Sequence, residues 1–200
     1  WIVVPNSIID QVGREAKQWY PAANILLGTA ATNAEGRRRL VAQSASSDWD
    51  MVIIPESAFT AIGVSERLRA DYIADQLDTL RTQLDDAASD RSKKAIERAL
   101  KTAKERLERL TAQEAKDTGL SFESSGADYL FVDEAHYYKN LQRGCNIQEL
   151  NCTKSSERAE DLALKLRVLR ERRREEAKAA GIAPHRVVER VATFMTGTPI

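Results

Sequence analysis

The sequence lacks several features that would assign it to a class at once. It has no apolar run of membrane-spanning length and no signal-peptide pattern, so we expect no membrane partner. Its 30 basic and 30 acidic residues cancel, so any nucleic-acid contact must be local. The only cysteines, Cys145 and Cys152, fit no zinc motif, and we expect free thiols in a reducing cytoplasm.

What the sequence does contain is a set of short, β-branched apolar runs that end at loop residues, a pattern typical of buried strands. The runs are residues 1–4, 24–28, 49–54, 129–132 and 191–195. A helix with an apolar face from Ile8 to Trp19 is predicted behind a cap at Ser7, followed by a short helix over 37–43 and a polar turn over 44–48. Strands separated by helices imply right-handed crossovers. The predicted fold class is therefore α/β, with a parallel sheet flanked by helices.

Residues 67–116 differ from the rest, because they contain neither proline nor glycine and are dense in charge. Apolar residues recur there at intervals of three and four on both sides of a polar break at residues 85–92. They are Ile73, Leu77, Leu80 and Leu84 before the break, and Ile96, Leu100, Ala103, Leu107 and Leu110 after it. This period predicts an inserted antiparallel helical hairpin with a coiled-coil-like seam. The alternative is one long helix that pairs with another chain.

A later helix is predicted near three candidate caps, and an arginine-rich run falls within it. The caps are Thr153, Ser155 and Ser156, and the buried stripe is Ala159, Leu162, Leu166 and Leu169. The arginines fall within residues 167–174. Local arginine clusters bind phosphate, but the neighbouring Glu171, Glu175 and Glu176 favour a solvated, charge-balanced face.

The motif Asp133-Glu134-Ala135-His136 directly follows the apolar run at residues 129–132. A buried parallel strand that ends in two carboxylates places charge at the carboxyl edge of the sheet, where ligands bind in open α/β folds. One carboxylate can hold Mg²⁺ at nucleotide phosphates, and the other can polarise the attacking water. The alternative is a surface turn with no chemistry.

Four segments occur in an order that resembles the first RecA-like lobe of superfamily-two helicases, most closely the Swi/Snf type. They are Val3-Val4-Pro5-Asn6-Ser7, Trp49-Asp50-Met51-Val52-Ile53-Ile54, Asp133-Glu134-Ala135-His136 and Thr196-Gly197-Thr198-Pro199-Ile200. Residues 131–141, which include Lys139-Asn140, match closely. Residues 155–162 and the hairpin are similar to large bacterial mobile-element proteins that join such a helicase to an adenine DNA methylase.

The resemblance implies a bacterial, cytoplasmic, DNA-dependent ATPase that uses ATP and Mg²⁺. Asp133 would act on Mg²⁺ through water, and Glu134 would orient or deprotonate the attacking water. Neutral His136 would hydrogen-bond to a coupling motif at residues 196–198. The hydroxyl partners there would be Thr196 and Thr198, with Gly197 allowing a tight turn. Pro5, Asn6 and Ser57 would contact the sugar and phosphate of DNA.

The same resemblance divides the chain into parts. Residues 1–63 and 120–200 would form a partial ATPase lobe, and residues 64–119 the inserted hairpin. The implied partners are duplex DNA, a second helicase lobe and an adenine methylase domain. Both ends look cut, because Trp1 opens inside a strand-like run and Ile200 follows the last motif directly.

One departure from the family bears on activity. The pattern G-x-x-x-x-G-K-[ST], whose loop cradles phosphates and supplies a lysine, does not occur in the sequence. Phosphoryl transfer depends on positioning and charge neutralisation, and the second lobe would donate an arginine finger. We therefore expect these 200 residues alone to be inactive.

Two other functions stay open from the sequence. The chain could be an interaction module on a degenerate ATPase scaffold, with the hairpin as the binding part, although the intact Asp133, Glu134 and His136 speak against it. It could also be a lobe of an RNA helicase that carries the same tetrapeptide. The long hairpin and the Lys139-Asn140 pair argue against that reading.

Overall fold

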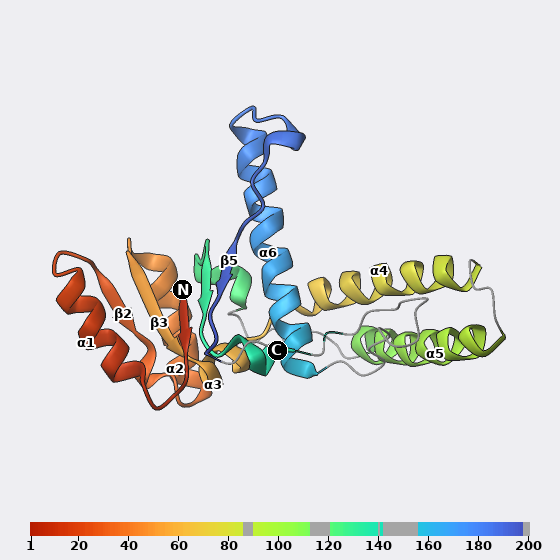
Figure 1. Ribbon diagram of the computed structural model, residues 1–200, viewed down its shortest axis with the longest axis horizontal. Helices are drawn as coiled ribbons and strands as arrows, with labels where there is room; N and C mark the ends of the chain where they lie inside the picture. Colours follow the sequence, from red (N-terminus) through yellow and green to blue (C-terminus); the bar gives the residue numbers. More distant parts are fainter. Residues whose placement is uncertain (86–89, 113–120, 140, 142–155, 198–200) are drawn as a thin grey trace.

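The computed structural model describes residues 1–85, 90–112, 121–139, 141 and 156–197. Five strands form one sheet in which every neighbouring pair is parallel (Figure 1). The order along the sheet is β2-β3-β1-β4-β5, so the chain crosses over between strands. The strands are β1 (Ile2–Val4), β2 (Ile25–Leu27), β3 (Met51–Pro55), β4 (Leu130–Val132) and β5 (Ala192–Phe194). The predicted α/β class and its five strands are confirmed.

Strand β1 lies at the centre of the sheet because both of its neighbours cover its backbone edges. Val3 lies beside Ile54 of β3 and Val132 of β4, and all three side chains are buried. Branched side chains suit this pleated, fully covered position. A centre of this kind explains why the strands read as continuous apolar runs rather than as alternating patterns.

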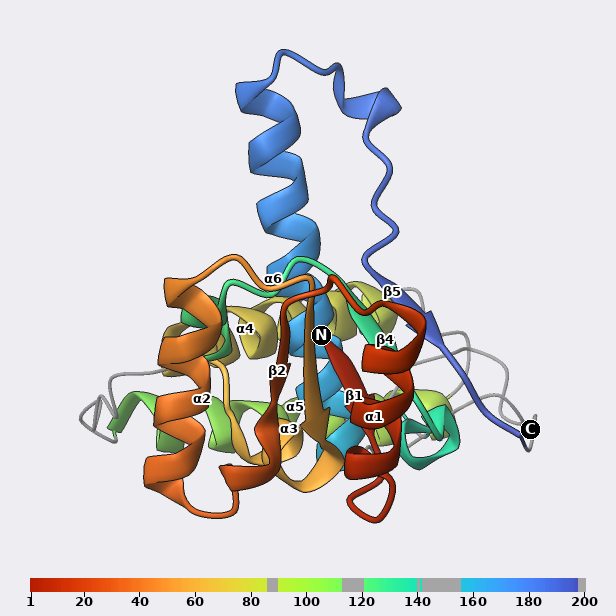
Figure 2. The ribbon, with the colours of Figure 1, turned by 90° about the vertical axis from the view of Figure 1, so that its left-hand side faces the viewer.

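Helices cover both faces of the sheet (Figure 2). On one face α1 (Ile9–Trp19) packs Ile9 against Val4 and Ile53. The opposite face carries the larger core, which takes side chains from α2 (Ala34–Ser46), α3 (Glu56–Ala61) and α6 (Glu157–Ala179). None of the described helices combines the length and apolar character needed to cross a bilayer.

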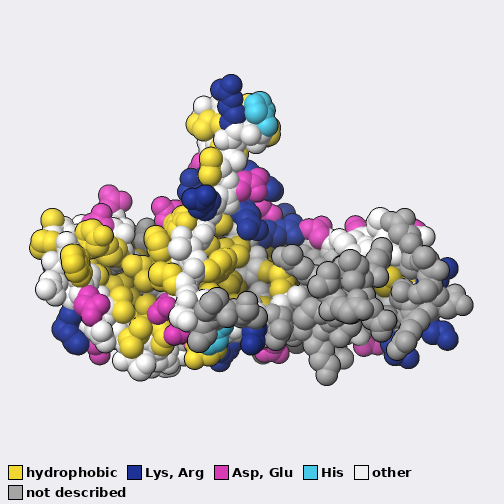
Figure 3. Space-filling model, in the orientation of Figure 1, with side chains coloured by type: hydrophobic (Ala, Val, Ile, Leu, Met, Phe, Trp, Pro, Cys, Tyr) yellow, Lys and Arg dark blue, Asp and Glu magenta, His cyan; other side chains and the backbone are white. Residues whose placement is uncertain are grey.

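Apolar side chains stay exposed on the sheet face that carries α1. Phe131 is 41% exposed, whereas Leu130 and Val132 on either side of it are buried in the opposite core. Helix α1 packs against β2 and β3, further along the sheet. Figure 3 shows hydrophobic side chains gathered over the sheet on this view of the molecule. Contiguous apolar surface is typical of contact with another protein part.

The first two helices correct the sequence analysis. Ser7 does not cap α1, whose N-cap is Ile8 and has no side-chain hydrogen bond. Helix α2 runs to Ser46 from a cap at Asn33, so the polar turn predicted over 44–48 is largely wrong. The reason is that Ser44 is buried and satisfied, since the Trp1 indole donates to its Oγ (3.0 Å), which in turn donates to a backbone carbonyl (2.7 Å).

The inserted antiparallel hairpin is confirmed. Helices α4 (Glu66–Asp85) and α5 (Asp90–Ala112) lie side by side and run in opposite directions (Figure 1). The break predicted over 85–92 was too wide, because Asp85 is the last residue of α4 and residues 90–92 belong to α5, while residues 86–89 lie outside the described residues. Ile73 and Leu77 are buried, and Leu80 and Leu84 nearer the tip are half-buried. The single long helix is therefore wrong. The bounds 64–119 stay a prediction, and Leu107, Leu110, Cys145 and Cys152 lie outside the described side chains.

Helix α6 begins at a cap that was among the three candidates. The Oγ of Ser156 accepts from the backbone N–H of Ala159 (3.1 Å), while Thr153 and Ser155 lie outside the described residues. Of the predicted stripe, Ala159, Leu162 and Leu169 are buried and Leu166 is half-buried. The buried face is wider than the stripe, because Leu164, Lys165 and Val168 belong to it as well.

The arginine-rich part of α6 is only partly a solvated face. Arg167 pairs with Glu171 (2.7 Å), as that prediction requires. Arg172, however, donates to the backbone carbonyls of Ala127 (2.6 Å) and Glu123 (2.8 Å). This arginine therefore joins α6 to the segment that leads into β4.

Lys165 is a fully buried cation in the middle of α6. Its Nζ donates to the carboxylate of Asp161 and to the backbone carbonyl of Phe59, and it lies 4.0 Å from the centroid of the Phe59 ring. Burial lowers the pKa of Lys165 to about 8, against the attraction of Asp161. The ammonium group of Lys165 is tolerated in the core because two oxygen atoms accept its hydrogen bonds and the aromatic ring of Phe59 lies beside it.

Candidate functional site

The carboxyl edge of the sheet gathers most of the residues that the sequence analysis selected. Because β1, β3, β4 and β5 are parallel, the residues after each of them meet at one edge. The segments concerned follow Val4, Pro55, Val132 and Phe194. Segments far apart in the sequence are thus brought together there by the strand order alone.

Asp133 is fixed by backbone and side-chain hydrogen bonds at the end of β4. Its N–H donates to the carbonyl of Val3 in β1 (2.9 Å), and its Oδ1 accepts from the N–H of Glu134 (2.8 Å). The short helix η3 (Ala135–Tyr138) follows, and Ala135 donates to the carbonyl of Met195 after β5 (2.9 Å). The carboxylate is therefore held in one orientation between the ends of β1 and β5.

Glu134 has a left-handed backbone, with φ 49° and ψ 45°, the one such non-glycine residue in the described part of the chain. This conformation brings Cβ close to the following carbonyl oxygen and costs about 1–2 kcal/mol. Strain of this kind is retained where the surrounding structure imposes it, and it gathers at functional sites. The strained backbone of Glu134 thus favours the hypothesis that Glu134 belongs to a functional site, which its place in the motif at residues 133–136 suggested.

This strain gives a first prediction. Glu134→Gly is expected to be more stable than Glu134→Ala by about 1 kcal/mol, because glycine adopts the left-handed region without the Cβ clash that alanine retains. Both variants lose the same carboxylate, so their difference isolates the backbone. Urea denaturation of the two proteins measures it, and equal midpoints would show that the backbone at Glu134 carries no strain.

His136 links the carboxylate motif to the segment after β5. Its Nδ1 lies 3.0 Å from Oε2 of Glu134 and 3.2 Å from Oγ1 of Thr196. Since an ionised carboxylate only accepts, the contact with Glu134 requires the proton on Nδ1. His136 and Thr196 therefore lie in contact, as the resemblance implied, while their coupling role stays a prediction.

The structure gives less support for the other two residues of the coupling motif, Gly197 and Thr198. A Cβ built at Gly197 would meet nothing within 4 Å, and its φ is not positive, so the structure shows no turn there that requires glycine. Thr198 lies outside the described residues.

The two segments assigned to DNA are joined to each other, although only Asn6 lies in a turn. Ser57 lies in the first turn of α3 and not in a loop as predicted, because α3 begins directly after β3. Asn6 Nδ2 donates to Ser57 Oγ (2.9 Å), and the N–H of Ser57 donates to Asn6 Oδ1 (3.2 Å). Both residues are exposed, and with Pro5 they line an open hollow of about 510 Å³. The rest of its wall comes from Ser7, Glu56, Thr60, Tyr137 and Arg158. The three predicted contact residues thus form one surface.

Two residues near this surface escaped the sequence analysis. Arg158 NH1 pairs with Oε1 of Glu56 (2.7 Å), a contact across 102 positions that no local pattern announces. Tyr138 is buried, and its hydroxyl meets no hydrogen-bond partner in the described part of the structure. Burial raises the pKa of Tyr138, and the carboxylates of Glu56 and Asp161 raise it further.

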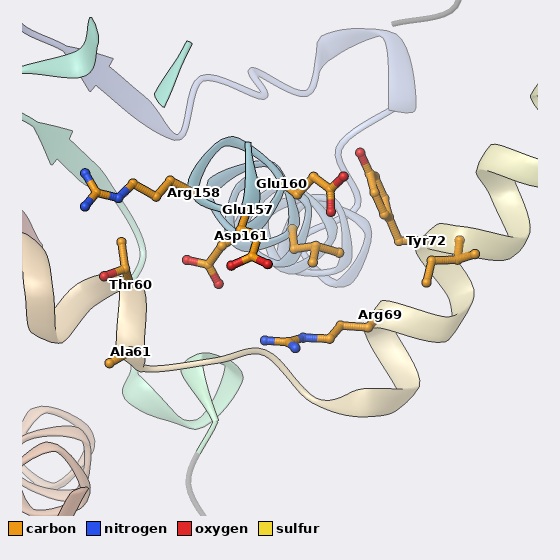
Figure 4. Close-up of a pocket in the computed structure, with 10 residues that line it drawn as sticks. Thr60, Ala61, Arg69, Tyr72, Glu157, Arg158, Glu160 and Asp161 are labelled. Carbon is orange, nitrogen blue, oxygen red and sulfur yellow. The ribbon is translucent and has the colours of Figure 1, made fainter. Parts of the chain in front are cut away.

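A second hollow, of about 490 Å³, lies between α3, α4 and α6 (Figure 4). Thr60 and Ala61 come from α3, and Arg69 and Tyr72 come from α4. Helix α6 contributes three acidic side chains together with Arg158, which therefore lines both hollows. In Figure 4 the guanidinium of Arg69 points toward the carboxylate of Asp161. Charges of both signs face each other here, and the hollow contains none of the predicted site residues.

The donor set at the edge suits magnesium better than a soft metal. In the described ranges no group of three or more histidine, cysteine, aspartate and glutamate side chains forms a metal cage. Magnesium needs no such cage, because it is bound by one or two carboxylates together with substrate phosphates and water. Asp133 and Glu134 fit that requirement.

An all-parallel, RecA-like sheet with adjacent carboxylates at its carboxyl edge defines an α/β protein of the helicase type. The chain belongs to the family described as probable helicase domain, whose model matches residues 2–196. No curated protein and no solved structure matches the chain. The family thus covers both the sheet and the inserted hairpin.

Proposed function

We propose that this chain forms part of the ATP-binding and ATP-hydrolysing lobe of a DNA-dependent ATPase, a helicase-like translocase of the Swi/Snf type. The observation that carries the proposal is the meeting of the Asp133 motif, the Thr196 segment and the hydrogen-bonded Asn6–Ser57 pair at one sheet edge. A nucleotide site beside a nucleic-acid surface is the arrangement such a motor requires. The family membership supports the helicase part of the proposal.

The proposed chemistry is shared between two carboxylates. Asp133, held by Val3 and by the N–H of Glu134, would bind Mg²⁺ through water. Bound Mg²⁺ and ATP would supply a phosphoryl group whose charge the metal neutralises. Glu134 would accept the proton of the attacking water, since its carboxylate lies next to Asp133 at the strand end. His136, in contact with both Glu134 and Thr196, would pass the state of this site to the segment after β5.

The proposed nucleic acid is duplex DNA, bound through its backbone. Asn6 and Ser57 offer an amide and a hydroxyl on one exposed surface, and such groups bind phosphate and sugar without reading bases. Localisation in a bacterial cytoplasm, a second lobe and an adenine methylase domain remain parts of the proposal that the resemblance suggests.

The alternatives predict other behaviour. An interaction module on a degenerate scaffold would have no reason to keep the strained Glu134 backbone beside Asp133. An RNA helicase lobe would prefer RNA over duplex DNA in a direct competition. Binding measurements with duplex DNA, single-stranded DNA and RNA of equal length separate these readings.

The missing phosphate loop gives a second prediction. The purified 200-residue chain is expected to bind ATP weakly or not at all and to release no phosphate above background, because no lysine loop neutralises the phosphates. A phosphate-release assay with and without duplex DNA tests this. Hydrolysis that DNA stimulates would show that these residues form a complete site.

A further inference from the structure

Arg158 lies on the same surface as the Asn6–Ser57 pair, although it comes from a distant part of the chain. It occupies the first turn of α6 and lines the hollow together with Pro5, Asn6 and Ser57. Its position is set by the packing of α6 against α3, which is fixed by the buried Lys165 and its bond to the Phe59 carbonyl. A cation is therefore held at a surface that otherwise offers neutral polar groups and one carboxylate, Glu56.

Glu56 also lines this hollow, and its negative charge would by itself repel a phosphate. The structure places this charge beneath the arginine, because the Glu56 side chain is 18% exposed and the Arg158 side chain is 55% exposed. The pair is joined at 2.7 Å, so the charge of the carboxylate is balanced, and Arg158 lines the hollow as the more exposed partner. The carboxylate acts here as a support that orients the arginine.

The guanidinium retains donors for a ligand. Arginine has five N–H groups in a fixed fork that matches phosphate geometry, and the bond to Glu56 uses one of them. Asn6 and Ser57, which line the same hollow, hold each other, so they keep their positions without a ligand. The hollow thus combines one fixed cation with two fixed neutral groups, a set that fits a phosphodiester.

We propose that Arg158 binds a backbone phosphate of duplex DNA in this hollow, with Glu56 as its positioning residue. The inference deepens the proposed function and rests on it, since it takes the Asn6–Ser57 surface to be the DNA side of the protein. The contact is independent of sequence, because it reaches the backbone and no base edge.

The experiment measures how the binding constant of the full chain for duplex DNA changes with salt. Each phosphate contact that is lost lowers the slope of log K against log [salt] by about 0.9. Arg158→Gln is therefore expected to lower this slope by about one and to weaken binding roughly tenfold at low salt. Arg158→Lys keeps the charge and should keep most of the slope.

Arg174→Gln is the matched control. Arg174 also pairs with a glutamate, Glu189, and its side chain is 57% exposed, close to the value for Arg158. It lies near the other end of α6, away from the hollow. We expect it to leave both slope and affinity unchanged. Thermal unfolding of all variants shows whether the fold is retained.

The outcomes separate the inference from the proposed function. If the parent chain binds duplex DNA and Arg158→Gln retains its slope, the inference is overturned and the proposed function stands. If the parent chain fails to bind duplex DNA, or binds only RNA, both are overturned. ATP titration distinguishes the two sources of phosphate, and it is made in a protein that joins this chain to a phosphate-binding loop and a second lobe, where nucleotide binding is expected. Loss of ATP binding in Arg158→Gln with an unchanged DNA slope would assign the arginine to the nucleotide and overturn the inference.

Discussion

Glu134→Gln is expected to abolish ATP turnover in a protein that joins this chain to a phosphate-binding loop and a second lobe, while nucleotide binding is retained. General acid–base groups contribute roughly 10²–10⁴ in rate, so the loss should reach that range. The amide keeps the size of the side chain and still accepts a hydrogen bond from His136 Nδ1, 3.0 Å away in the parent. Only the ability to take a proton from water is removed.

A phosphate-release assay gives the turnover, and a fluorescent nucleotide gives the binding constant. Glu175→Gln, an exposed change of the same kind far along α6, is the control and should behave like the parent. Unchanged turnover in Glu134→Gln would remove this residue from its assigned role. Loss of nucleotide binding together with turnover would instead assign Glu134 to holding the nucleotide.

The sheet could be predicted because each strand carries its own signal. Strands β1 and β3 are largely buried on both faces, and β4 carries Phe131 on a partly open face, yet all three read as short apolar runs that end at proline or aspartate. The hairpin was equally visible, since glycine and proline are absent and the apolar period breaks once between α4 and α5. These are local properties of the chain.

The parts that escaped prediction depend on distant neighbours. Ser44 reads as a turn residue, yet it is buried because Trp1 and the carbonyl of Ser125 satisfy its hydroxyl. Arg158 reads as one charge in a charged helix, and only the fold brings it to Glu56. Of the site, the motif residues could be predicted from their order, but the surface that Arg158 completes required the packing of α6.

Lys165 is the clearest case of a residue whose surroundings could not be predicted from its local sequence. Its substitution is expected to have the largest effect on stability. Lys165→Ala is expected to lower the free energy of unfolding by about 3–5 kcal/mol, because it leaves the Asp161 carboxylate without its buried cation and the Phe59 carbonyl without a donor. For a chain of this length the melting temperature should fall by roughly 10 °C. Lys178→Ala, exposed on the same helix, should change stability by less than about 0.5 kcal/mol.

Removing both charges of the Lys165–Asp161 pair should lower the free energy of unfolding far less than removing Lys165 alone. The double variant Lys165→Met, Asp161→Leu fills the same space with apolar atoms, so no unpaired charge remains. Replacement of a buried pair in this way is often neutral or stabilising by about 1–4 kcal/mol. Urea denaturation of the single and double variants gives the coupling between the two residues. A double variant as unstable as Lys165→Ala would mean that packing, and not the unpaired carboxylate, sets the cost.

The pH dependence of the same pair tests its charge directly. Burial lowers the pKa of Lys165 to about 8 in the folded chain, against an ordinary value of 10.5, with Asp161, Arg69 and Glu123 as the charged groups around it. Between these values the unfolded chain binds more protons, so the free energy of unfolding rises with pH. Relative to the double variant, the parent should gain up to about 3 kcal/mol between pH 8 and 10.5, at roughly 1.4 kcal/mol per unit. Parallel curves for the two proteins would show that Lys165 titrates alike in both states, and the attraction of Asp161 would then offset the whole desolvation cost of the ammonium.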